Sequence, residues 1–190
     1  MKWLFCPVLR DRWFAGIIKK KHAEWMDMKI RKAVMADLNE IMEIYAQARD
    51  FMVRTGNPHQ WAERGWPPIG LIRQDIEAEK CYVCQDEMSL AAVFFFDYGE
   101  NVDPCYAIIE GGSWKKDGPY GVVHRIAARK GRGAGKLCIQ WAYDRCGHLR
   151  IDTHADNHVM QKVLQQLGFV YCGVIYIEDN HAPRLAYEKA

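Results

Sequence analysis

The 190-residue sequence has no long hydrophobic run and no strong excess of either charge. No stretch approaches the roughly 18 consecutive apolar residues of a membrane-spanning helix, and we expect no membrane partner. The formal net charge is only +2, from 26 basic and 24 acidic side chains that are mixed along the chain. This balance is not typical of a nucleic-acid-binding protein, and we expect no nucleic-acid partner either.

The residue pairs that would build a zinc site are also missing. Cys81 and Cys84 form a CxxC pair, but no second close pair of Cys or His residues accompanies it. The pair lies in a strand-like run, where positions three apart point to opposite faces, so we predict buried thiols and no metal site. The odd total of seven cysteines, in a chain long enough to hold a core without disulfides, favours reduced thiols and a cytoplasmic location.

A secretory signal peptide is a third missing feature. Arg10, Asp11 and Arg12 divide the apolar stretches near the N-terminus, which therefore lack the continuous apolar region of such a signal. We expect residues 1–27 to be a poorly ordered N-terminal extension and residues 28–190 to form one domain. The hydrophobic fraction of 49% is sufficient for one full core.

Periodic patterns over residues 28–190 predict an α/β domain with a mixed sheet and helices on both faces. Asp37 and Glu40 have the form of an N-cap and its reciprocal partner at the start of the first helix. Residues 90–96 show no polar alternation, which predicts a strand covered on both faces. Strands are predicted over residues 29–33, 81–85, 89–98, 106–110, 149–153, 169–177 and 184–188, and a further strand ends near residue 127. Helices are predicted over residues 38–52, 71–79, 134–146 and 157–167.

A basic, glycine-rich turn joins the strand that ends near residue 127 to the helix over residues 134–146. The first N–H groups of a helix lack internal partners, and the helix dipole adds partial positive charge there. Glycines let the backbone approach an anion closely, and basic side chains add full charges. The turn therefore predicts a site for a diphosphate or an equally anionic group. Its basic residues are Arg129, Lys130, Arg132 and Lys136.

Two standard phosphate-binding motifs do not fit this turn. A Walker A loop needs Ser or Thr after Gly135-Lys136, but Leu137 stands there. The dinucleotide fingerprint GxGxxG fails because Lys136 occupies the place of its third glycine. Asp152 still ends the next strand about 20 residues further on, where a ribose-binding acid would lie. A dinucleotide-binding oxidoreductase therefore stays open as an alternative.

The turn and a second element together resemble a known family. Residues 130–135 are similar to the (Gln/Arg)-x-x-Gly-x-(Gly/Ala) acyl-CoA loop of the GCN5-related N-acetyltransferases, the GNAT family, with Lys130 at the first position. Asn157 opens a helical segment that closes with Leu-Gly-Phe at residues 167–169, as in that family. The order of strands and helices upstream also fits, so the resemblance covers residues 28–189.

The resemblance implies the acyl-CoA N-acyltransferase fold, with a mixed, mostly antiparallel sheet flanked by helices. It also implies an N-acetyltransferase that uses acetyl-CoA as acyl-donor co-substrate and acetylates a primary amine of a small acceptor by direct attack. The family's positions for contacts to the pantetheine arm fall on Ile126, Ala127 and Ala128, and a further side-chain contact to the arm falls on Asn157. Its positions for the diphosphate fall on Lys130, Gly131, Gly133, Ala134, Gly135 and Lys136.

The attacking amine must be neutral, and two residues are candidates for the catalytic base. Glu110 is the first choice, because it ends an apolar run beside two glycines and can face a cleft; the alternative is a solvated charge at a strand end. His124 is the second choice, since it lies two residues before the arm-contact segment and histidine suits proton transfer near neutral pH. For His124 the alternative is a core histidine bonded to the backbone. Asp152, His154 and Asp156 form a third cluster, in which a helix cap is the alternative role.

One feature of the family is absent. In many relatives a tyrosine five residues before the Phe of Leu-Gly-Phe protonates the leaving thiolate, but Leu164 stands at this position. Either another group serves as the acid or none is needed. The absence mildly favours a second alternative function, a non-catalytic acyl-CoA-binding sensor.

The acceptor region is the least defined part of the sequence. In the family, the region around the first two helices shapes the acceptor pocket, so the aromatic-rich loop over residues 57–70 is expected to do the same; a lid that packs on the core is the alternative. Trp61, Trp66 and Trp114 indicate a partly apolar pocket for a small-molecule amine. The sequence leaves open whether the chain forms a homodimer.

Overall fold

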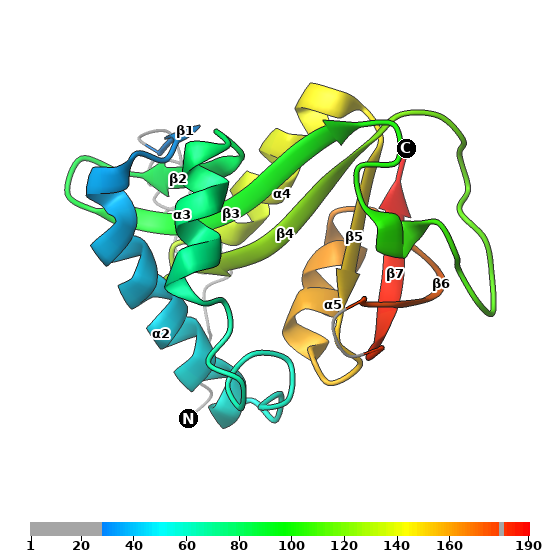
Figure 1. Cartoon of the computed structure of the whole chain (residues 1–190), viewed down its shortest axis with the longest axis horizontal. Coiled ribbons are helices and arrows are strands. Elements are labelled where there is room, and N and C mark those ends of the chain that lie inside the picture. The colour runs from blue at the N-terminus through cyan, green and yellow to red at the C-terminus, as the bar shows by residue number, and fades with distance from the viewer. Residues whose placement is uncertain (1–27, 179–180) are drawn as a thin grey trace, which may run out of the picture.

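Seven strands form one sheet in the order β1-β2-β3-β4-β5-β7-β6 (Figure 1). The computed structural model describes residues 28–178 and 181–190, so the expected extension over residues 1–27 lies outside the described part. Neighbouring strands run antiparallel except β4 and β5, which are parallel. The predicted mixed, mostly antiparallel sheet is confirmed, and it is not the doubly wound parallel sheet that a dinucleotide-binding oxidoreductase requires. The strands are β1 (Lys29–Lys32), β2 (Cys81–Gln85), β3 (Leu90–Gly99), β4 (Tyr120–Ala128), β5 (Leu149–Thr153), β6 (Val170–Tyr176) and β7 (Pro183–Lys189).

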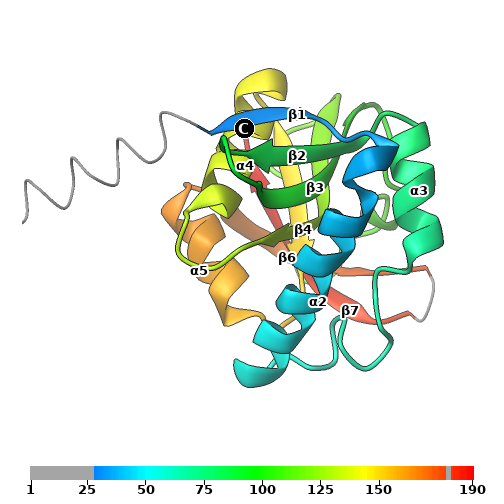
Figure 2. The ribbon, with the colours of Figure 1, turned by 90° about the vertical axis from the view of Figure 1, so that its left-hand side faces the viewer.

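Helices cover both faces of the sheet (Figure 2). On one face, α2 and α3 pack on the sheet around buried residues such as Ile41 and Val93. On the other face, α4 and α5 pack around Phe94 and Ile139. The helices are α2 (Leu38–Arg54), α3 (Ile69–Glu77), α4 (Ala134–Cys146) and α5 (His158–Gln166). Within the described ranges, no helix has the length and apolar character to cross a membrane.

The continuous apolar run of β3 reflects burial on two sides. Val93 belongs to the core beneath α2 and α3, whereas Ala92 and Phe94 belong to the core beneath α4 and α5. Cys81 and Cys84 on β2 divide between the same two cores. Both predictions, a strand covered on two faces and a CxxC pair that points in opposite directions, are confirmed.

β4 and β5 pair over a short distance only. The register joins Gly121 to Leu149 and Val122 to Arg150, and no pairing follows along the rest of the two strands, which separate (Figure 1). Side chains pack closely against Gly121, since a Cβ there would lie 2.8 Å from Cys146 Sγ, and a larger residue would have to displace them. Beyond the pairing point, none of the described strands lies on that side of β4 to satisfy its backbone N–H and C=O groups. This opening positions the site described below.

A buried charged cluster holds the sheet together at this pairing point. Glu188 on β7 is 1% exposed, and its Oε1 lies 2.6 Å from His148 Nε2 and accepts a 3.1 Å hydrogen bond from Arg150 Nε. His148 Nδ1 faces the carbonyl oxygen of Pro119 at 3.0 Å, and the backbone N–H of Lys115 donates to Glu188 Oε2. Burial alone would raise the pKa of Glu188, but the hydrogen bonds that the carboxylate accepts outweigh burial and lower the pKa.

The predicted cap of the first helix is right in position but wrong in its hydrogen bonds, because Asp37 is the N-cap residue of α2 but its side chain makes no capping bond to that helix. Asp37 Oδ2 accepts a 2.8 Å hydrogen bond from the N–H of Val34, and Glu40 Oε1 accepts a 2.9 Å bond from the N–H of Leu90. The reason is a short 3-10 helix, Met35–Asp37, that precedes α2 and moves the helical start three residues upstream. Glu40 is thereby free to bind the neighbouring strand.

The predicted strand over residues 106–110 is also wrong. Pro104–Tyr106 forms a second 3-10 helix, capped by Asp103 Oδ1, which accepts a 2.8 Å bond from the N–H of Cys105. Only Glu110 pairs, through an isolated antiparallel bridge to β6. The apolar run that suggested a strand is not uniformly buried, since Tyr106 is 2% exposed but Ile108 is 72% exposed.

We predict that Glu188→Gln lowers the free energy of unfolding by about 3–5 kcal/mol at pH 7, because removing one partner leaves buried charges uncompensated. The pKa of Glu188 is lowered in the folded state, so its stabilising contribution is present above the ordinary glutamate pKa of 4.5 and is lost as the pH falls through the lower folded value. The difference between wild type and variant should therefore shrink in acid. Urea unfolding over a pH series measures both effects.

Glu79→Gln is the matched control. Glu79 pairs with Lys32 at 2.6 Å, but its side chain is 71% exposed, so the variant should leave the unfolding midpoint unchanged. Equal effects of the two substitutions would contradict a structural role for the buried cluster.

Candidate functional site

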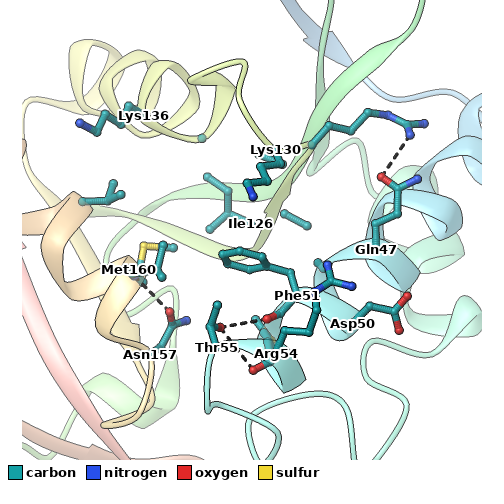
Figure 3. Close-up of a pocket in the computed structure, with 18 of the residues that line it drawn as sticks. Gln47, Asp50, Phe51, Arg54, Thr55, Ile126, Lys130, Lys136, Asn157 and Met160 are labelled. Carbon is teal, nitrogen blue, oxygen red and sulfur yellow. Dashed lines mark hydrogen bonds between the residues drawn. The ribbon is translucent and has the colours of Figure 1, made fainter.

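Two cavities meet at β4. The first, of about 480 Å³, lies among α2, the end of β4, the start of α4 and α5 (Figure 3). The second, of about 420 Å³, lies among the loop that follows α2, the middle of β4, β5 and the ends of β6 and β7. The two cavities share Met52, Ile126, Asn157 and Met160 as lining residues. Groups bound in the two cavities would therefore meet beside Ile126.

The glycine-rich turn brings the start of α4 to the first cavity. Gly131 and Gly133 have φ values of +89° and +69°, which glycine adopts without strain. Gly133 is the N-cap of α4 and has no side chain to bind the first N–H groups of the helix. These groups and the helix dipole make the turn a site for an anion.

The basic residues of the turn differ in how far other residues hold their charged groups. Arg129 donates to the carbonyl oxygen of Leu90 at 2.9 Å, and Arg132 pairs with Asp86, so both guanidinium groups are held by the protein. Lys130 and Lys136 line the first cavity together with Arg129, and Lys136 Nζ donates a hydrogen bond to Gln166 Oε1. Figure 3 shows Lys130 extending into the cavity, and no ion pair joins it to another residue of the described ranges.

A bulge in β4 lies between the two cavities. Arg125 has a φ of +50°, in the left-handed region that non-glycine residues rarely adopt. Val93 pairs with Ala127 whereas Phe95 pairs with His124, so β4 carries one extra residue between these pairs. The residues before the bulge line the second cavity, and those after it line the first.

Contacts from three elements hold the bulge. The Arg125 guanidinium donates two 3.0 Å hydrogen bonds to Asp75 on α3 and lies 4.5 Å over the ring of Phe95 on β3. The hydroxyl of Tyr45 on α2 donates a 2.8 Å bond to the carbonyl oxygen of Arg125. Burial raises the pKa of Asp75 and outweighs the opposing effect of Arg125. The strained backbone is therefore fixed by buried partners.

His124 lies in the second cavity between two carboxylates. Its Nε2 is 2.8 Å from Asp103 Oδ2, and its Nδ1 is 3.6 Å from Asp152 Oδ1. The hydroxyl of Tyr106 donates a 2.8 Å hydrogen bond to the same Asp152 oxygen. In neutral His124 the Nε2–H donates to Asp103, which leaves the lone pair on Nδ1. Burial alone would raise the pKa of Asp103, but the hydrogen bond and charge of His124, with the N–H of Cys105, lower it.

Asn157 lies where the two cavities join. Its Oδ1 accepts a 3.1 Å hydrogen bond from the N–H of Met160 and so caps α5. Its Nδ2 donates a 3.0 Å bond to Gln60 Oε1, in the loop that follows α2. The residue therefore ties α5 to the acceptor-side loop while it lines both cavities.

Glu110 lies away from both cavities. Its side chain is exposed, its Oε2 accepts a 3.0 Å hydrogen bond from the Tyr176 hydroxyl, and it lines neither cavity. Trp114 also lies elsewhere, packed at 5.2 Å on the ring of Tyr106, whereas Trp61 and Trp66 line the second cavity. Leu164, at the position of the expected tyrosine, is a fully buried core residue.

Most of the predicted cofactor residues line the first cavity: Ile126, Ala127, Ala128, Lys130, Gly135, Lys136 and Asn157. Gly131 and Gly133 lie in the turn between them, and Ala134 is the first residue of α4. The contribution of Phe51, near the end of α2, and of Thr55, its C-cap residue, was not predicted, because nothing in the helical pattern of this segment distinguishes side chains that line a cavity. Among the described residues, no group of three His, Cys, Asp or Glu side chains is arranged as a metal site.

Structural comparison places the chain among known acetyltransferases. A GNAT-family acetyltransferase from Streptococcus agalactiae 2603 is 31% identical, with a TM-score of 0.77, over 85% of this chain and 94% of that chain. Two further structures share the fold. One is a GNAT-family acetyltransferase from Listeria monocytogenes 4b F2365, with 18% identity and a TM-score of 0.59 over 85% of this chain and 94% of that chain. The other is the ribosomal-protein-S18-alanine N-acetyltransferase from Escherichia coli, with 12% identity and a TM-score of 0.55 over 85% of this chain and 92% of that chain. No protein-family model and no curated protein matches the sequence.

We predict that His124→Gln raises the pKa of Asp103, because burial of the carboxyl persists while the charge and the hydrogen bond that lower its pKa are weakened. In wild type, the stability that this carboxylate contributes is present above the ordinary aspartate pKa and is lost as the pH falls through the lower folded value. A carbon-13 NMR titration of the Asp103 carboxyl measures the shift. His59→Gln is the control, since His59 pairs on the surface with Glu63; an unchanged Asp103 titration in His124→Gln would contradict the contact.

Proposed function

The chain belongs to the GNAT family of acetyltransferases, and we propose that it transfers the acetyl group of acetyl-CoA directly to a primary amine of a small acceptor. The observation that carries this proposal is the junction of the two cavities at Ile126. One cavity has an anion site at a helix start, and the other has a histidine held by a carboxylate. Donor and acceptor would approach the same point of β4 from opposite sides.

The first cavity is proposed to bind the donor. The open N–H groups at the start of α4, with Lys130 and Lys136, suit its diphosphate. Beyond the pairing point, β4 lacks a neighbouring strand and can offer backbone hydrogen bonds to the amide groups of the pantetheine arm along Ile126, Ala127 and Ala128. A backbone N–H in this segment would stabilise the negative charge that develops on the thioester oxygen.

The second cavity is proposed to bind the acceptor and accept its proton. The amine nitrogen attacks the thioester carbon, a C–N bond forms, the C–S bond breaks, and CoA leaves as the thiolate. The proton of the amine passes to Nδ1 of His124, directly or through one water. Asp103 fixes the ring by accepting from Nε2–H, and the resulting imidazolium lies between Asp103 and Asp152.

No general acid is assigned to the leaving thiolate. The position of the family's tyrosine holds Leu164, which is buried in the core and carries no proton to donate. A free thiol has a pKa of about 8.5, so a thiolate is a tolerable leaving group near neutral pH. Protonation by solvent suffices in this mechanism.

We predict that Gly133→Asp weakens acetyl-CoA binding by roughly 100-fold or more, because it places a carboxylate at the start of α4 against the diphosphate. Gly133→Asn has a similar size and tolerates the same positive φ, and should cost much less affinity. Gly147→Asp is the second control: Gly147 caps the other end of α4 with a φ of +62°. Calorimetric titration measures all four proteins, and equal affinities would exclude the turn as the diphosphate site.

We predict that His124→Gln lowers kcat by roughly 10²–10⁴-fold and leaves the Kd for acetyl-CoA unchanged, because the residue acts on the acceptor's proton. Glu110→Gln tests the rival hypothesis from the sequence, in which Glu110 is the base. Thiol release and product mass, measured with a panel of primary amines, separate the two. Loss of turnover in Glu110→Gln alone would reverse the assignment, and tight acetyl-CoA binding without turnover in wild type would favour the sensor function.

A further inference from the structure

A buried arginine lines the second cavity at the far side of Asp152 from His124. Arg184 on β7 is 8% exposed, and its Nη1 donates a 3.1 Å hydrogen bond to the carbonyl oxygen of Pro183. Its Nε lies 4.0 Å from Asp152 Oδ2, which is beyond hydrogen-bond distance. Its remaining N–H groups have no acceptor among the described residues. Burial lowers the pKa of Arg184 despite the nearby Asp152, which is the direction expected when a buried charge is incompletely compensated.

Three other charged groups of this cavity are committed to partners within the protein, and the cavity is also lined by Arg64, which lies 5.9 Å over the ring of Trp66, and by the exposed Glu178. Arg125 makes its two 3.0 Å bonds to Asp75. Asp103 accepts from His124 and from the N–H of Cys105, and Asp152 accepts from the Tyr106 hydroxyl. Arg184 is a buried cation of this cavity whose guanidinium makes one hydrogen bond, to the Pro183 carbonyl oxygen, so a ligand that enters meets donors still available on it.

The structure also sets the distance between this cation and the base. His124 Nδ1 lies 3.6 Å from one oxygen of Asp152, and Arg184 Nε lies 4.0 Å from the other oxygen. Both groups thus face the same carboxylate, and their separation is at most these two distances plus the width of that carboxylate. Such a spacing suits a molecule whose amine and anionic group are joined by one or a few carbon atoms.

We infer that the acceptor is an amino acid, whose carboxylate pairs with the Arg184 guanidinium while its amine faces His124 Nδ1. A planar carboxylate matches the fork of a guanidinium, which can donate two parallel hydrogen bonds to it. Trp61, Trp66 and Leu71 line the same cavity and provide room for an apolar side chain. This inference rests on the proposed acetyltransferase function and adds the class of acceptor to it.

The first test needs only the wild-type protein. Acetyl-CoA is supplied with leucine, methionine and phenylalanine, and in parallel with the amide and the decarboxylated amine of each. We expect kcat/KM for the amino acids to exceed that for the matching amides and amines by at least about tenfold, because only the amino acids carry a carboxylate for Arg184. Thiol release gives the rate, and product mass confirms acetylation of the amine.

The second test uses variants of Arg184. Arg184→Gln should raise the KM for amino acids about 100-fold and leave that for the amides and amines unchanged, since a charge-assisted bond is lost only for the carboxylate. Arg184→Lys keeps the positive charge but loses the two-pronged guanidinium, so its KM for amino acids should lie between those of wild type and Arg184→Gln. Arg145→Gln, on the outer surface of α4, is the control and should behave as wild type. Unchanged acetyl-CoA affinity and melting temperature show that each variant is folded.

Three outcomes decide the inference. A preference for amino acids that disappears in Arg184→Gln supports it. Acetylation of amides and amines as fast as amino acids, with no response to Arg184→Gln, overturns it and leaves the acetyltransferase function standing. Binding of acetyl-CoA without acetylation of any compound in a broad amine panel overturns the proposed function itself, and the inference with it.

Discussion

The parallel pairing of β4 and β5 ends after two residue pairs, and the site depends on this early separation. The buried Glu188 cluster fixes the strands where they pair, so the separation begins at a defined point. Beyond that point, one edge of β4 has backbone groups that no strand satisfies, although it lies inside the domain. An extended ligand with amide groups can occupy that edge. The cavity beside β4 is therefore a consequence of sheet topology rather than of a particular side chain.

The bulge at Arg125 turns this edge into a junction between two cavities. One extra residue in β4 changes which side chains face each cavity, and it places the backbone of Arg125 in a strained, left-handed conformation. Asp75, Tyr45 and Phe95 supply the contacts that offset the strain. The charges then divide along β4, with Lys130, Lys136 and the helix N–H groups on one side and His124 with its carboxylates on the other. That division separates binding of the donor's phosphates from proton transfer at the acceptor.

Local sequence patterns predicted the parts of the fold that local physics decides. The helix at Ala134–Cys146 and the strand at Leu149–Thr153 have the predicted bounds, because caps and apolar spacing mark their ends. The strand predicted over residues 106–110 is wrong, because an apolar run also occurs where some side chains are buried and others are exposed, as Tyr106 and Ile108 are. The bulge and the pairing of Asp103 with His124 could not be predicted, because each depends on contacts between residues 20 or more positions apart. The buried state of Arg184 depends in the same way on its place in the assembled sheet.

The most direct test of the account is a crystal structure of the protein with acetyl-CoA bound. We expect the diphosphate on the N–H groups at the start of α4, the arm along residues 126–128 of β4, and the thioester carbon at the junction of the cavities, within reach of a group next to His124. A diphosphate bound elsewhere, or a thioester that lies away from Ile126, would contradict it.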